Sequence, residues 1–449
     1  MQDKPQGAAG RVILSLSRDT VYTRGGTTLA VAISISDAQQ LKTLIIRKGT
    51  AIMKDLTILP AAKVGSRYTF HYTLQQTDAA QFNFSFSATG TGGKVYDTKF
   101  LHVDSRMGLL PVSLQMVARE TGRSLTTDSV PAPNKTAEKY DVGCTDLGIM
   151  WKMGNGHIGI FFGDTQGNDF IPSAGGGGNG SNWRSNVLAF SDNTDLSKGL
   201  IFSSMATEKG NPSVARQIVY SPHITDGTGS YSAIPTAAIH ANGADYVAYM
   251  DVKSWGDPGK WTTNFSGLYT SADDGQNWQA CPEIRFSANS HFSQVCFATK
   301  DSYVYMIGTV SGRFGAAYLA RFPESDMLHQ QDYTYWNAAS GWVKNDESAA
   351  TPLFAAPVGE LSLTYNSRFK RWIATYLDVN RGAIVLRDAE EITGEWSAEH
   401  TLVKSKDYPG LYGGFIYPAE SNDDVLYFTM SLWYPYNVFL MKAKLKLIK

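Results

Sequence analysis

Hydrophobic residues alternate with polar ones in short runs along most of the chain, and clusters of glycine, asparagine, aspartate and serine separate these runs. A period of two is the pattern of a strand that buries one face, whereas the helical period is scarce in this sequence. The pattern therefore predicts an all-β fold of many short strands joined by tight turns.

The first part with this pattern spans residues 11–104. It contains the runs RVILSLS, TLAVAISIS, LKTLIIRKG, SRYTFHYTL, AQFNFSFSATG and KVYDTKFLHVD. Six or seven short strands in about 95 residues are typical of an immunoglobulin-like β-sandwich. We therefore expect a polar tether over residues 1–10, an accessory sandwich over 11–104, and a linker with one further strand over 105–135.

A longer motif recurs five times beyond residue 136. Each copy is a strand, a polar turn and a second strand rich in aromatic and aliphatic residues. The copies begin at Thr145, Ile234, Phe292, Gly359 and Tyr412. Radial repetition of small sheets is the propeller architecture, so residues 136–449 are predicted to form a five-bladed β-propeller.

A turn motif supports this assignment. Residues 271–278 read SADDGQNW and fit S-x-D-x-G-x-x-W, the Asp-box turn between the two outer strands of sialidase-like blades. TGEWS at 393–397 resembles a degenerate copy. In this turn the Ser and Asp side chains bond the backbone while Trp packs beneath, so we expect Asp273 to serve folding rather than catalysis.

The first copy of the repeated motif carries an aspartate at each open end. Asp146 lies nine residues before Asn155, the centre of a Gly-Asn-Gly turn, and Asp164 lies nine residues after it. In an antiparallel pair about this turn the two would face each other, with Cβ atoms about 5 Å apart. Like charges so placed destabilise a hairpin, whereas a glycosidase needs two carboxyl groups beside the scissile bond. Nine residues exceed a typical strand, so both acids are expected in loops just beyond it.

The equivalent ends of the other copies carry further polar and aromatic residues. If each copy is the inner strand pair of a blade, these ends open on one face, where loops on a rigid scaffold favour function. The positions are Asp146, Asp164, Asp251, Gln294, Arg313, Glu360, Asp378, Tyr412 and Trp433. We expect these side chains to converge on a single mouth.

Charge and hydropathy exclude several classes of partner. The formal net charge is −1 and the pI is near 6.7, which gives no long-range attraction to nucleic acid or anionic lipid. No run of eighteen apolar residues is present, so no membrane-spanning segment is predicted. The start, MQDKPQGAAG, resembles a polar tether left after removal of a leader, and we therefore expect an exported protein.

The three cysteines form no CxxC pair and cannot all pair with one another. Buried free thiols are favoured for them over a bridge between Cys281 and Cys296. No HExxH motif exists, and neither a metal site nor an organic cofactor is predicted.

Six motifs carry a resemblance to a known family. TDLG, FGDT, WRSN, the GR of SGRFG, GELSLTYN and LWYPYNVFLM resemble, in this order, the five-bladed propeller family long labelled as of unknown function and now placed in glycoside hydrolase family 183, the endo-D-arabinanases. The resemblance covers about residues 110–449. It implies cleavage of internal α-linked D-arabinofuranosyl bonds, as in mycobacterial cell-wall arabinan. It also implies that Asp146 and Asp164 are the catalytic acids.

Hydrolysis of a furanoside needs a protonated acid at the leaving oxygen and an ionised carboxylate acting on water or on the anomeric carbon. Asp146 and Asp164 could divide these roles, because two close carboxylates do not both ionise easily. The sequence does not assign the roles. Glu360 is a third candidate, as an acid or as a group that shifts the pKa of the pair. The alternative is that all three carboxyls bond neighbouring turns and loops.

The remaining candidates would bind substrate through N–H donors, amides and flat aromatic faces. They are Arg184, Asn186, His240, Gln294, Arg313, Tyr412 and Trp433. Structural roles compete for each: a salt bridge for the arginines, a turn contact for the histidine and core packing for the aromatics.

The sequence thus favours a monomeric, endo-acting glycoside hydrolase on an arabinofuranosyl polysaccharide or oligosaccharide. Two alternatives stay open. One is an exo-glycosidase or sialidase-like hydrolase, suggested by the Asp-box. The other is a non-catalytic glycan-binding propeller of a surface uptake system, in which the two aspartates would diverge or be locked in salt bridges.

Overall fold

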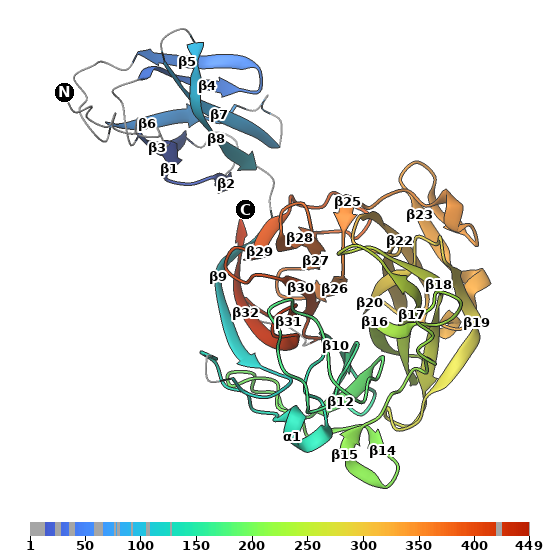
Figure 1. Cartoon of the computed structure of the whole chain (residues 1–449). Coiled ribbons are helices and arrows are strands. Elements are labelled where there is room, and N and C mark those ends of the chain that lie inside the picture. The colour runs from blue at the N-terminus through green and yellow to red at the C-terminus, as the bar shows by residue number, and fades with distance from the viewer. Residues whose placement is uncertain are drawn as a thin grey trace, which may run out of the picture. The chain divides into compact units, whose positions relative to one another are not determined.

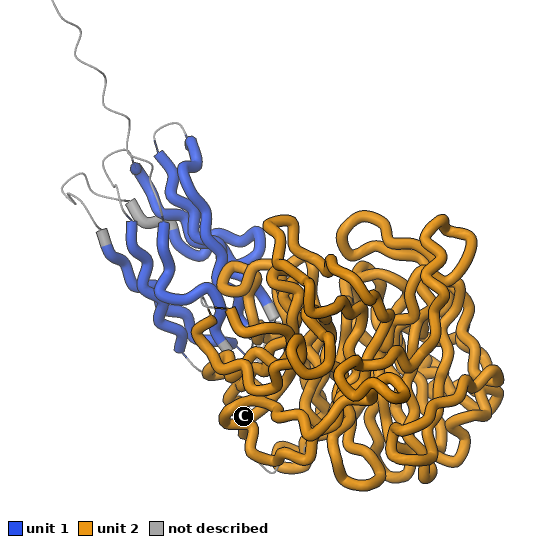
Figure 2. Tube along the Cα trace, turned by 60° about the horizontal axis from the view of Figure 1, so that its bottom comes forward, with its two compact units in different colours: residues 1–108, 447–449 blue, residues 109–446 orange. Residues whose placement is uncertain are grey.

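The computed structural model of the 449-residue chain describes residues 14–22, 28–35, 41–57, 66–75, 78, 81–90, 93–104, 108–125, 128–418 and 424–448. The predicted tether at 1–10 lies outside these residues. Regular structure in the described parts is almost entirely strand, which confirms the all-β prediction. The chain divides into two compact units, residues 1–108 with 447–449 and residues 109–446 (Figure 2). No helix among the described residues is long and apolar enough to cross a membrane.

Unit 1 contains two sheets that share a hydrophobic core. One sheet has the order β1 (Leu14–Leu16), β3 (Thr28–Ile35), β6 (Ser66–Thr73). The other has the order β2 (Thr20–Tyr22), β8 (Val95–Asp104), β7 (Gln81–Gly90), β4 (Leu41–Lys48), β5 (Ala51–Thr57). Alternate residues of β3 and β7, among them Val31 and Phe84, are fully buried in one cluster that draws on both sheets. The period-two pattern of the sequence therefore buries one face of each sheet.

Unit 2 contains five sheets of at least four strands within the described residues, grouped around a common centre (Figure 1). The first sheet is β10 (Leu147–Lys152), β11 (Ile158–Phe162), β12 (Val187–Ser191), β13 (Ser204–Met205), and the second is β16 (Ser232–Ala241), β17 (Ala244–Trp255), β18 (Trp261–Ser271), β19 (Gln279–Ser287). The third is β20 (Gln294–Lys300), β21 (Tyr303–Thr309), β22 (Gly315–Pro323), β23 (Thr334–Asn337), β24 (Gly341–Lys344), with β25 (Phe354–Val358) also paired to β22.

The fourth sheet is β26 (Leu361–Asn366), β27 (Arg371–Asp378), β28 (Ala383–Ala389), β29 (His400–Lys404). The fifth is β30 (Leu411–Ile416), β31 (Val425–Leu432), β32 (Asn437–Ile448), β9 (Gly108–Arg119). A short helix, α1 (Thr136–Tyr140), and the pair β14 (Thr207–Glu208) and β15 (Asn211–Ala215) lie outside these sheets.

The first strand of each sheet packs against the first strand of the next. The contacts run from β10 to β16, β16 to β20, β20 to β26, β26 to β30, and from β30 back to β10. Each of the five repeated sequence segments supplies the first two strands of one sheet as an antiparallel pair. The repeats therefore occupy equivalent places around the centre, and equivalent loop positions meet there.

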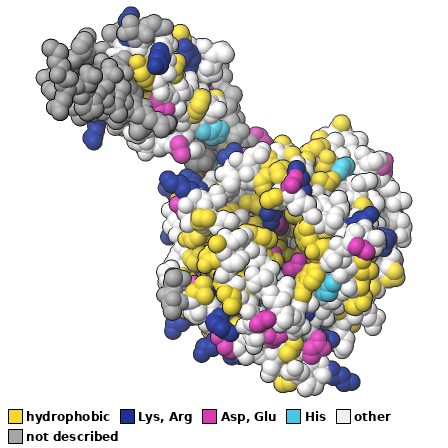
Figure 3. Space-filling view, viewed as in Figure 1, with side chains coloured by type: hydrophobic (Ala, Val, Ile, Leu, Met, Phe, Trp, Pro, Cys, Tyr) yellow, Lys and Arg dark blue, Asp and Glu magenta, His cyan; other side chains and the backbone are white. Residues whose placement is uncertain are grey.

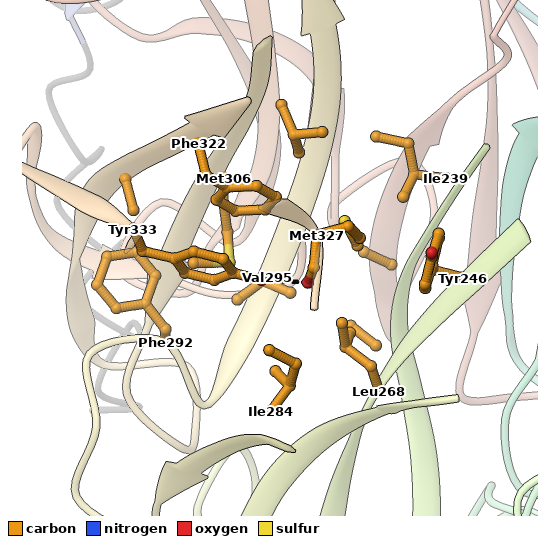
Figure 4. Close-up of a cluster of buried hydrophobic side chains, with 14 of the residues drawn as sticks. Ile239, Tyr246, Leu268, Ile284, Phe292, Val295, Met306, Phe322, Met327 and Tyr333 are labelled. Atoms are coloured by element: carbon orange, nitrogen blue, oxygen red, sulfur yellow. Dashed lines mark hydrogen bonds between the residues drawn. The ribbon is translucent and has the colours of Figure 1, made fainter. Parts of the chain in front are cut away.

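Apolar faces of neighbouring sheets pack together away from the centre. Between the second and third sheets, Leu268, Phe292 and Met306 belong to one buried cluster (Figure 4). Phe322 stacks on Tyr333 in the same cluster, with ring centroids 3.8 Å apart and planes at 9°. All three cysteines of the chain are buried and free, which confirms the prediction for them.

The Asp-box turn joins β18 to β19, the two outer strands of the second sheet. The Ser271 hydroxyl donates to the Asp273 carboxylate at 2.9 Å and accepts from the Gly275 N–H at 3.0 Å. Asp273 also accepts from the Asn277 N–H, and the Trp278 indole donates to the Gly275 carbonyl. The carboxylate is used by the turn itself, as the sequence predicts for a folding device.

The fifth sheet combines strands from both ends of unit 2, because β9 pairs beside β32. Glu120, directly after β9, fixes this junction: its N–H donates to the Val438 carbonyl, and its buried carboxyl accepts from the Leu200 N–H and the Asn134 amide, both at 2.9 Å. Burial raises the pKa of Glu120 to about 8, although the two hydrogen bonds oppose the shift.

This burial makes the stability of unit 2 depend on pH. The folded pKa lies above the unfolded value of 4.5, so the folded state holds the extra proton and loses stability as pH rises from about 4.5 to about 8. At about 1.4 kcal/mol per pKa unit, the loss is on the order of 5 kcal/mol. Glu120→Gln, which cannot ionise, should flatten this part of the profile in thermal unfolding at pH 5, 7 and 9. Parallel profiles of the variant and the wild type would contradict the assignment.

Candidate active site

A cavity of ≈ 780 Å³ opens at the centre of unit 2, at the loop ends of the inner strands. Figure 3 shows a hollow at the centre of this unit, with hydrophobic side chains around it and charged ones within. Its charged lining residues are Asp146, Asp164, Asp257, Lys260, Arg313 and Glu360, and its aromatic ones are Trp183, Tyr231, Trp255, Trp261, Tyr412, Phe415, Trp433 and Tyr436. All five sheets or their loops contribute to this wall.

The β10–β11 hairpin carries both aspartates, but its register differs from the simple expectation. Ile149 pairs with Phe161, which is symmetric about Asn155, and a bulge then shifts the register so that Leu147 pairs with Phe162. Asp146 therefore lies opposite Gly163, whose N–H donates to the Asp146 carbonyl at 3.2 Å, and not opposite Asp164. Both aspartates line the same cavity, but they are offset by one position in the strand pairing. The prediction that they lie directly opposite each other is therefore wrong.

Hydrogen bonds hold the bulge, and a close contact requires glycine opposite Asp146. Leu147 and Gly148 both have positive φ, 69° and 82°, and the fifth sheet holds them: the Leu147 N–H donates to the Ser431 hydroxyl, and the Thr429 hydroxyl donates to the Gly148 carbonyl. A Cβ on Gly163 would lie 2.4 Å from Asp146 Oδ1, so only glycine allows the carboxyl to occupy this place.

Asp146 is partly exposed to the cavity and receives its hydrogen bonds from the fifth sheet. The hydroxyls of Tyr412 and Tyr436 donate to its Oδ2 at 2.9 and 3.1 Å, while its Oδ1 is buried without a partner among the described residues. Burial raises the pKa of Asp146 to about 7, and the negative charges of Asp164 and Glu360 add to the rise while the two tyrosines oppose it. The carboxyl is thus poised to hold a proton near neutrality.

Asp164 receives its hydrogen bonds from the first and second sheets. The Trp183 indole N–H and the Ser232 hydroxyl both donate to Oδ1, at 2.7 and 2.6 Å. Burial raises the pKa of Asp164 to about 6, and these two bonds oppose the rise. The Trp183 ring is itself held by His223, with ring centroids 3.9 Å apart.

Glu360 is held in an ion pair with Arg313. The Arg313 Nε and Nη2 donate to the Glu360 carboxylate at 2.6 to 3.2 Å in a two-pronged pair. The guanidinium also lies over the rings of Tyr412 and Trp261, 5.0 and 5.7 Å from the centroids. The negative charge of Glu360 helps to raise the pKa of Asp146.

Two further predicted residues line the cavity and also brace its loops. Gln294 donates from Nε2 to the carbonyls of Val310 and Gly312, and so fixes the loop that presents Arg313. Trp433 donates from its indole to the Gly175 carbonyl and thereby holds the glycine-rich loop at the edge of the cavity. Seven of the ten predicted site residues thus meet in one place: Asp146, Asp164, Gln294, Arg313, Glu360, Tyr412 and Trp433.

Arg184, Asn186 and His240 do not line the cavity. The Arg184 guanidinium donates to three backbone carbonyls and is buried. The Asn186 amide is fully buried, where it donates to two carbonyls and accepts from two N–H groups. His240 lies near the opposite end of β16 from Ser232 and bonds Asp245 at 3.0 Å. These side chains join neighbouring segments of the chain outside the cavity wall.

Asp251 and Asp378, expected at the same mouth, also lie outside the cavity wall. Asp251 accepts from the Asn264 amide at 2.7 Å. Asp378 accepts from the N–H groups of the turn that follows it and forms an ion pair with Arg381 at 3.1 Å. Both carboxylates are therefore used within their own sheets.

The sequence of unit 2 is similar to a known protein family. Residues 131–442 match the family model described as "Domain of unknown function (DUF4185)". The chain belongs to the DUF4185 family. The family match includes both aspartates, the Arg313–Glu360 pair and the two tyrosines that bond Asp146.

Two fungal proteins and one solved structure are similar to the chain. Notoamide biosynthesis cluster protein J of Aspergillus sp. (strain MF297-2) is 27% identical over 340 residues, which cover 72% of this chain and 88% of that protein. Notoamide biosynthesis cluster protein J' of Aspergillus versicolor is 28% identical over 315 residues, 67% of this chain and 83% of that protein. Zg3597, a family 117 glycoside hydrolase of Zobellia galactanivorans, aligns at a TM-score of 0.42 with 10% identity, over 74% of this chain and 90% of that one. A likeness of this degree establishes neither a shared fold nor a shared activity.

The DUF4185 domain also places residues at the cavity that sequence reasoning missed. Trp183 and Tyr436 bond the two aspartates. They lie in the motifs WRSN and LWYPYNVFLM, where the predicted site residues are Arg184, Asn186 and Trp433 instead. The loop 255–261 lines the cavity with every one of its residues. Its sequence, WGDPGKW, reads as an ordinary hairpin turn, and only the packing of the sheets brings it to the centre.

The tyrosine bonds to Asp146 predict a pKa effect that can be measured. Each bond stabilises the ionised carboxylate, so Tyr412→Phe and Tyr436→Phe should each raise the pKa of Asp146 above about 7. The exposed neighbour Tyr434 has no bond to Asp146 within the described residues, and Tyr434→Phe is the control. Carboxyl-carbon NMR titration would show the shift, and an unchanged midpoint in both variants would exclude these bonds in solution.

Proposed function

We propose that the DUF4185 domain is an endo-acting glycoside hydrolase that cleaves arabinofuranosyl polysaccharide of the D-arabinan type by two-carboxylate catalysis. The observation that carries the proposal is a pair of carboxyls, Asp146 and Asp164, that share a cavity wall and have raised pKa values of about 7 and about 6. Carboxyls with separately set pKa values are what glycoside hydrolysis requires. The motif resemblance to endo-D-arabinanases supports the choice of substrate.

The hydrogen bonds support a division of roles. Trp183 can only donate, so Asp164 Oδ1 must accept, and this carboxyl is suited to the ionised role of base or nucleophile. Tyrosine hydroxyls can donate or accept, so Asp146 keeps its partners whether or not it carries a proton. Asp146, with the higher pKa and the nearby charge of Glu360, is the acid that protonates the leaving oxygen.

The cavity suits a neutral sugar chain. Its volume of ≈ 780 Å³ falls in the range of about 300–1,000 Å³ for ligand pockets. Tryptophan and tyrosine rings supply flat apolar faces for furanose rings, and hydroxyl-bearing sugars could satisfy the unpartnered Asp146 Oδ1. No organic cofactor is part of this scheme.

The charge of the wall argues against a sialidase. An anionic sugar needs free cationic groups, but Arg313 is the one arginine among the described lining residues and it is paired with Glu360. The remaining lining charges are three aspartates and one lysine. A purely glycan-binding role is disfavoured because neither Asp146 nor Asp164 is in an ion pair within the described residues.

We also infer the architecture and setting that go with this activity. The closed series of contacts from β10 round to β30 supports a five-bladed β-propeller for unit 2. The two sheets over one core support an immunoglobulin-like accessory module for unit 1. A polymeric cell-wall substrate would require an exported protein, and a single chain supplies every residue of the site, so a monomer suffices.

Substitution of either acid tests the proposal most directly. Asp146→Asn and Asp164→Asn should each reduce oligosaccharide release from arabinogalactan by about a thousandfold or more, because catalytic carboxyls supply several kcal/mol of barrier lowering. Asp301→Asn, at an exposed turn, is the matched control and should keep full activity. Release by the two variants at the wild-type rate would remove the assignment.

The pKa values also predict the pH profile. Activity should rise as Asp164 ionises near pH 6 and fall as Asp146 loses its proton near pH 7, giving a narrow bell in kcat/KM. Glu360→Gln should move the alkaline limb to lower pH, because the Glu360 charge helps raise the pKa of Asp146. Glu391→Gln, on an exposed turn, should leave the limb in place. A plateau from pH 5 to 9 would contradict the division of roles.

A further inference from the structure

The loop between β17 and β18 forms one side of the cavity. Residues 255–261 all line it, and the tryptophans at the two ends of the loop, Trp255 and Trp261, pair directly across the hairpin. Trp255 is 40% exposed, which is unusual for so large an apolar ring. The two ring centroids are 5.6 Å apart with planes at 66°, so the rings form an apolar corner.

Hydrogen bonds hold this loop in place before any ligand binds. The Gly256 N–H donates to the Lys260 carbonyl at 2.9 Å, which closes the turn. The Arg313 N–H donates to the Gly259 carbonyl at 2.9 Å, and the hydroxyls of Thr263 and Ser311 bond at 2.9 Å. The corner is therefore tied to the same loop of the third sheet that presents Arg313, and little ordering cost remains for binding.

The corner also holds an unused hydrogen-bond donor. Trp261 Nε1 is buried and has no partner among the described residues, although a buried indole N–H usually finds one. Two other cavity residues share this property, Gln166 through Oε1 and Asp146 through Oδ1. Unpaired donors and acceptors around one cavity match a ligand that carries several hydroxyls.

The position of the loop relates it to both members of the acid pair. Ser232, in the same sheet as the loop, donates to Asp164. The Arg313 guanidinium lies over the rings of both Trp261 and Tyr412, and Tyr412 bonds Asp146. The loop therefore borders the same cavity as the acid pair. Lys260 and Asp257 pair with each other at 3.2 Å, so the loop carries no net charge and favours a neutral ligand.

We propose that the corner formed by Trp255 and Trp261 is a subsite for a neutral sugar residue of the glycan chain, next to the bond being cleaved. The sugar ring stacks on Trp255, and the Trp261 N–H donates to one of its hydroxyls. The subsite rests on the proposed function for its place in the chain, but its ligand class follows from the loop itself.

Binding can be measured without hydrolysis. In an Asp146→Asn background, arabino-oligosaccharides are titrated by calorimetry. Trp255→Ala should raise Kd by about tenfold, as expected for the loss of one stacking surface, while Trp255→Phe should stay within about threefold. Trp261→Phe keeps a ring but removes the N–H, and should raise Kd by about fivefold. In the active enzyme, Trp255→Ala should raise KM and leave kcat within about twofold.

The outer hairpin of the third sheet offers a matched control. Trp336 and Trp342 form a similar pair with centroids 5.3 Å apart, but neither lines the cavity. Trp342→Ala should leave both Kd and KM unchanged, and thermal unfolding checks that each variant is folded.

The possible outcomes separate the subsite from the hydrolase. If oligosaccharide is released and Trp255→Ala binds as tightly as Trp342→Ala, the subsite is excluded while hydrolysis stands. If oligosaccharide binds, Trp255→Ala weakens it and nothing is hydrolysed, the subsite stands and the hydrolase proposal fails. Absence of binding by the folded Asp146→Asn protein would overturn the subsite for this sugar class.

Discussion

The contact between the first and fifth sheets is the constraint on which the site depends. Tyr412 and Tyr436 bond Asp146 from positions 266 and 290 residues further along the chain. The same contact holds the bulge, since the Leu147 N–H donates to the Ser431 hydroxyl. Without this bulge the hairpin would keep the simple register, and Asp146 would oppose Asp164 instead of a glycine. One long-range interface therefore sets the place, the partners and the proton affinity of the carboxyl.

Different neighbours give the two aspartates different chemistry. They lie 18 residues apart on one hairpin, yet they accept hydrogen bonds from different sheets. Asp146 accepts from two tyrosine hydroxyls of the fifth sheet, and Asp164 accepts from an indole N–H of the first sheet and a serine hydroxyl of the second. An indole N–H has one hydrogen-bonding role and a hydroxyl has two. The asymmetry between the carboxyls therefore comes from their surroundings, and a pair of identical residues can serve two functions. Glu360, which is paired with Arg313, adds the effect of its negative charge to the surroundings of Asp146.

Much of this arrangement could be predicted because it depends on local patterns. The five inner strand pairs are predicted by the alternation of hydrophobic and polar residues and by the turn residues between them. The Asp-box is predicted by the spacing of its own residues, because its hydrogen bonds lie within the turn. The convergence of Asp146, Glu360 and Arg313 then follows from equivalence among the repeats. Asn186 shows the limit of this reasoning, because its amide satisfies four backbone groups that belong to two separate segments. Which backbone groups need such a partner depends on tertiary packing, and the sequence next to a polar residue does not reveal it. The bulge at Gly148 and the inward loop at 255–261 are hidden for the same reason.

The pairing of β9 with β32 has a consequence for how the domain is made. During synthesis the first sheet of unit 2 is made before the fifth is complete, so both hydroxyls that bond Asp146, and the strand that pairs with β9, are among the last parts of unit 2 to emerge. Until then β9 has an unpaired edge and Asp146 lacks the neighbours that tune it. The neighbours that tune Asp146 are therefore complete only when the last strands of unit 2 have been made, and a nascent chain carries both aspartates before it carries the hydroxyls that bond one of them.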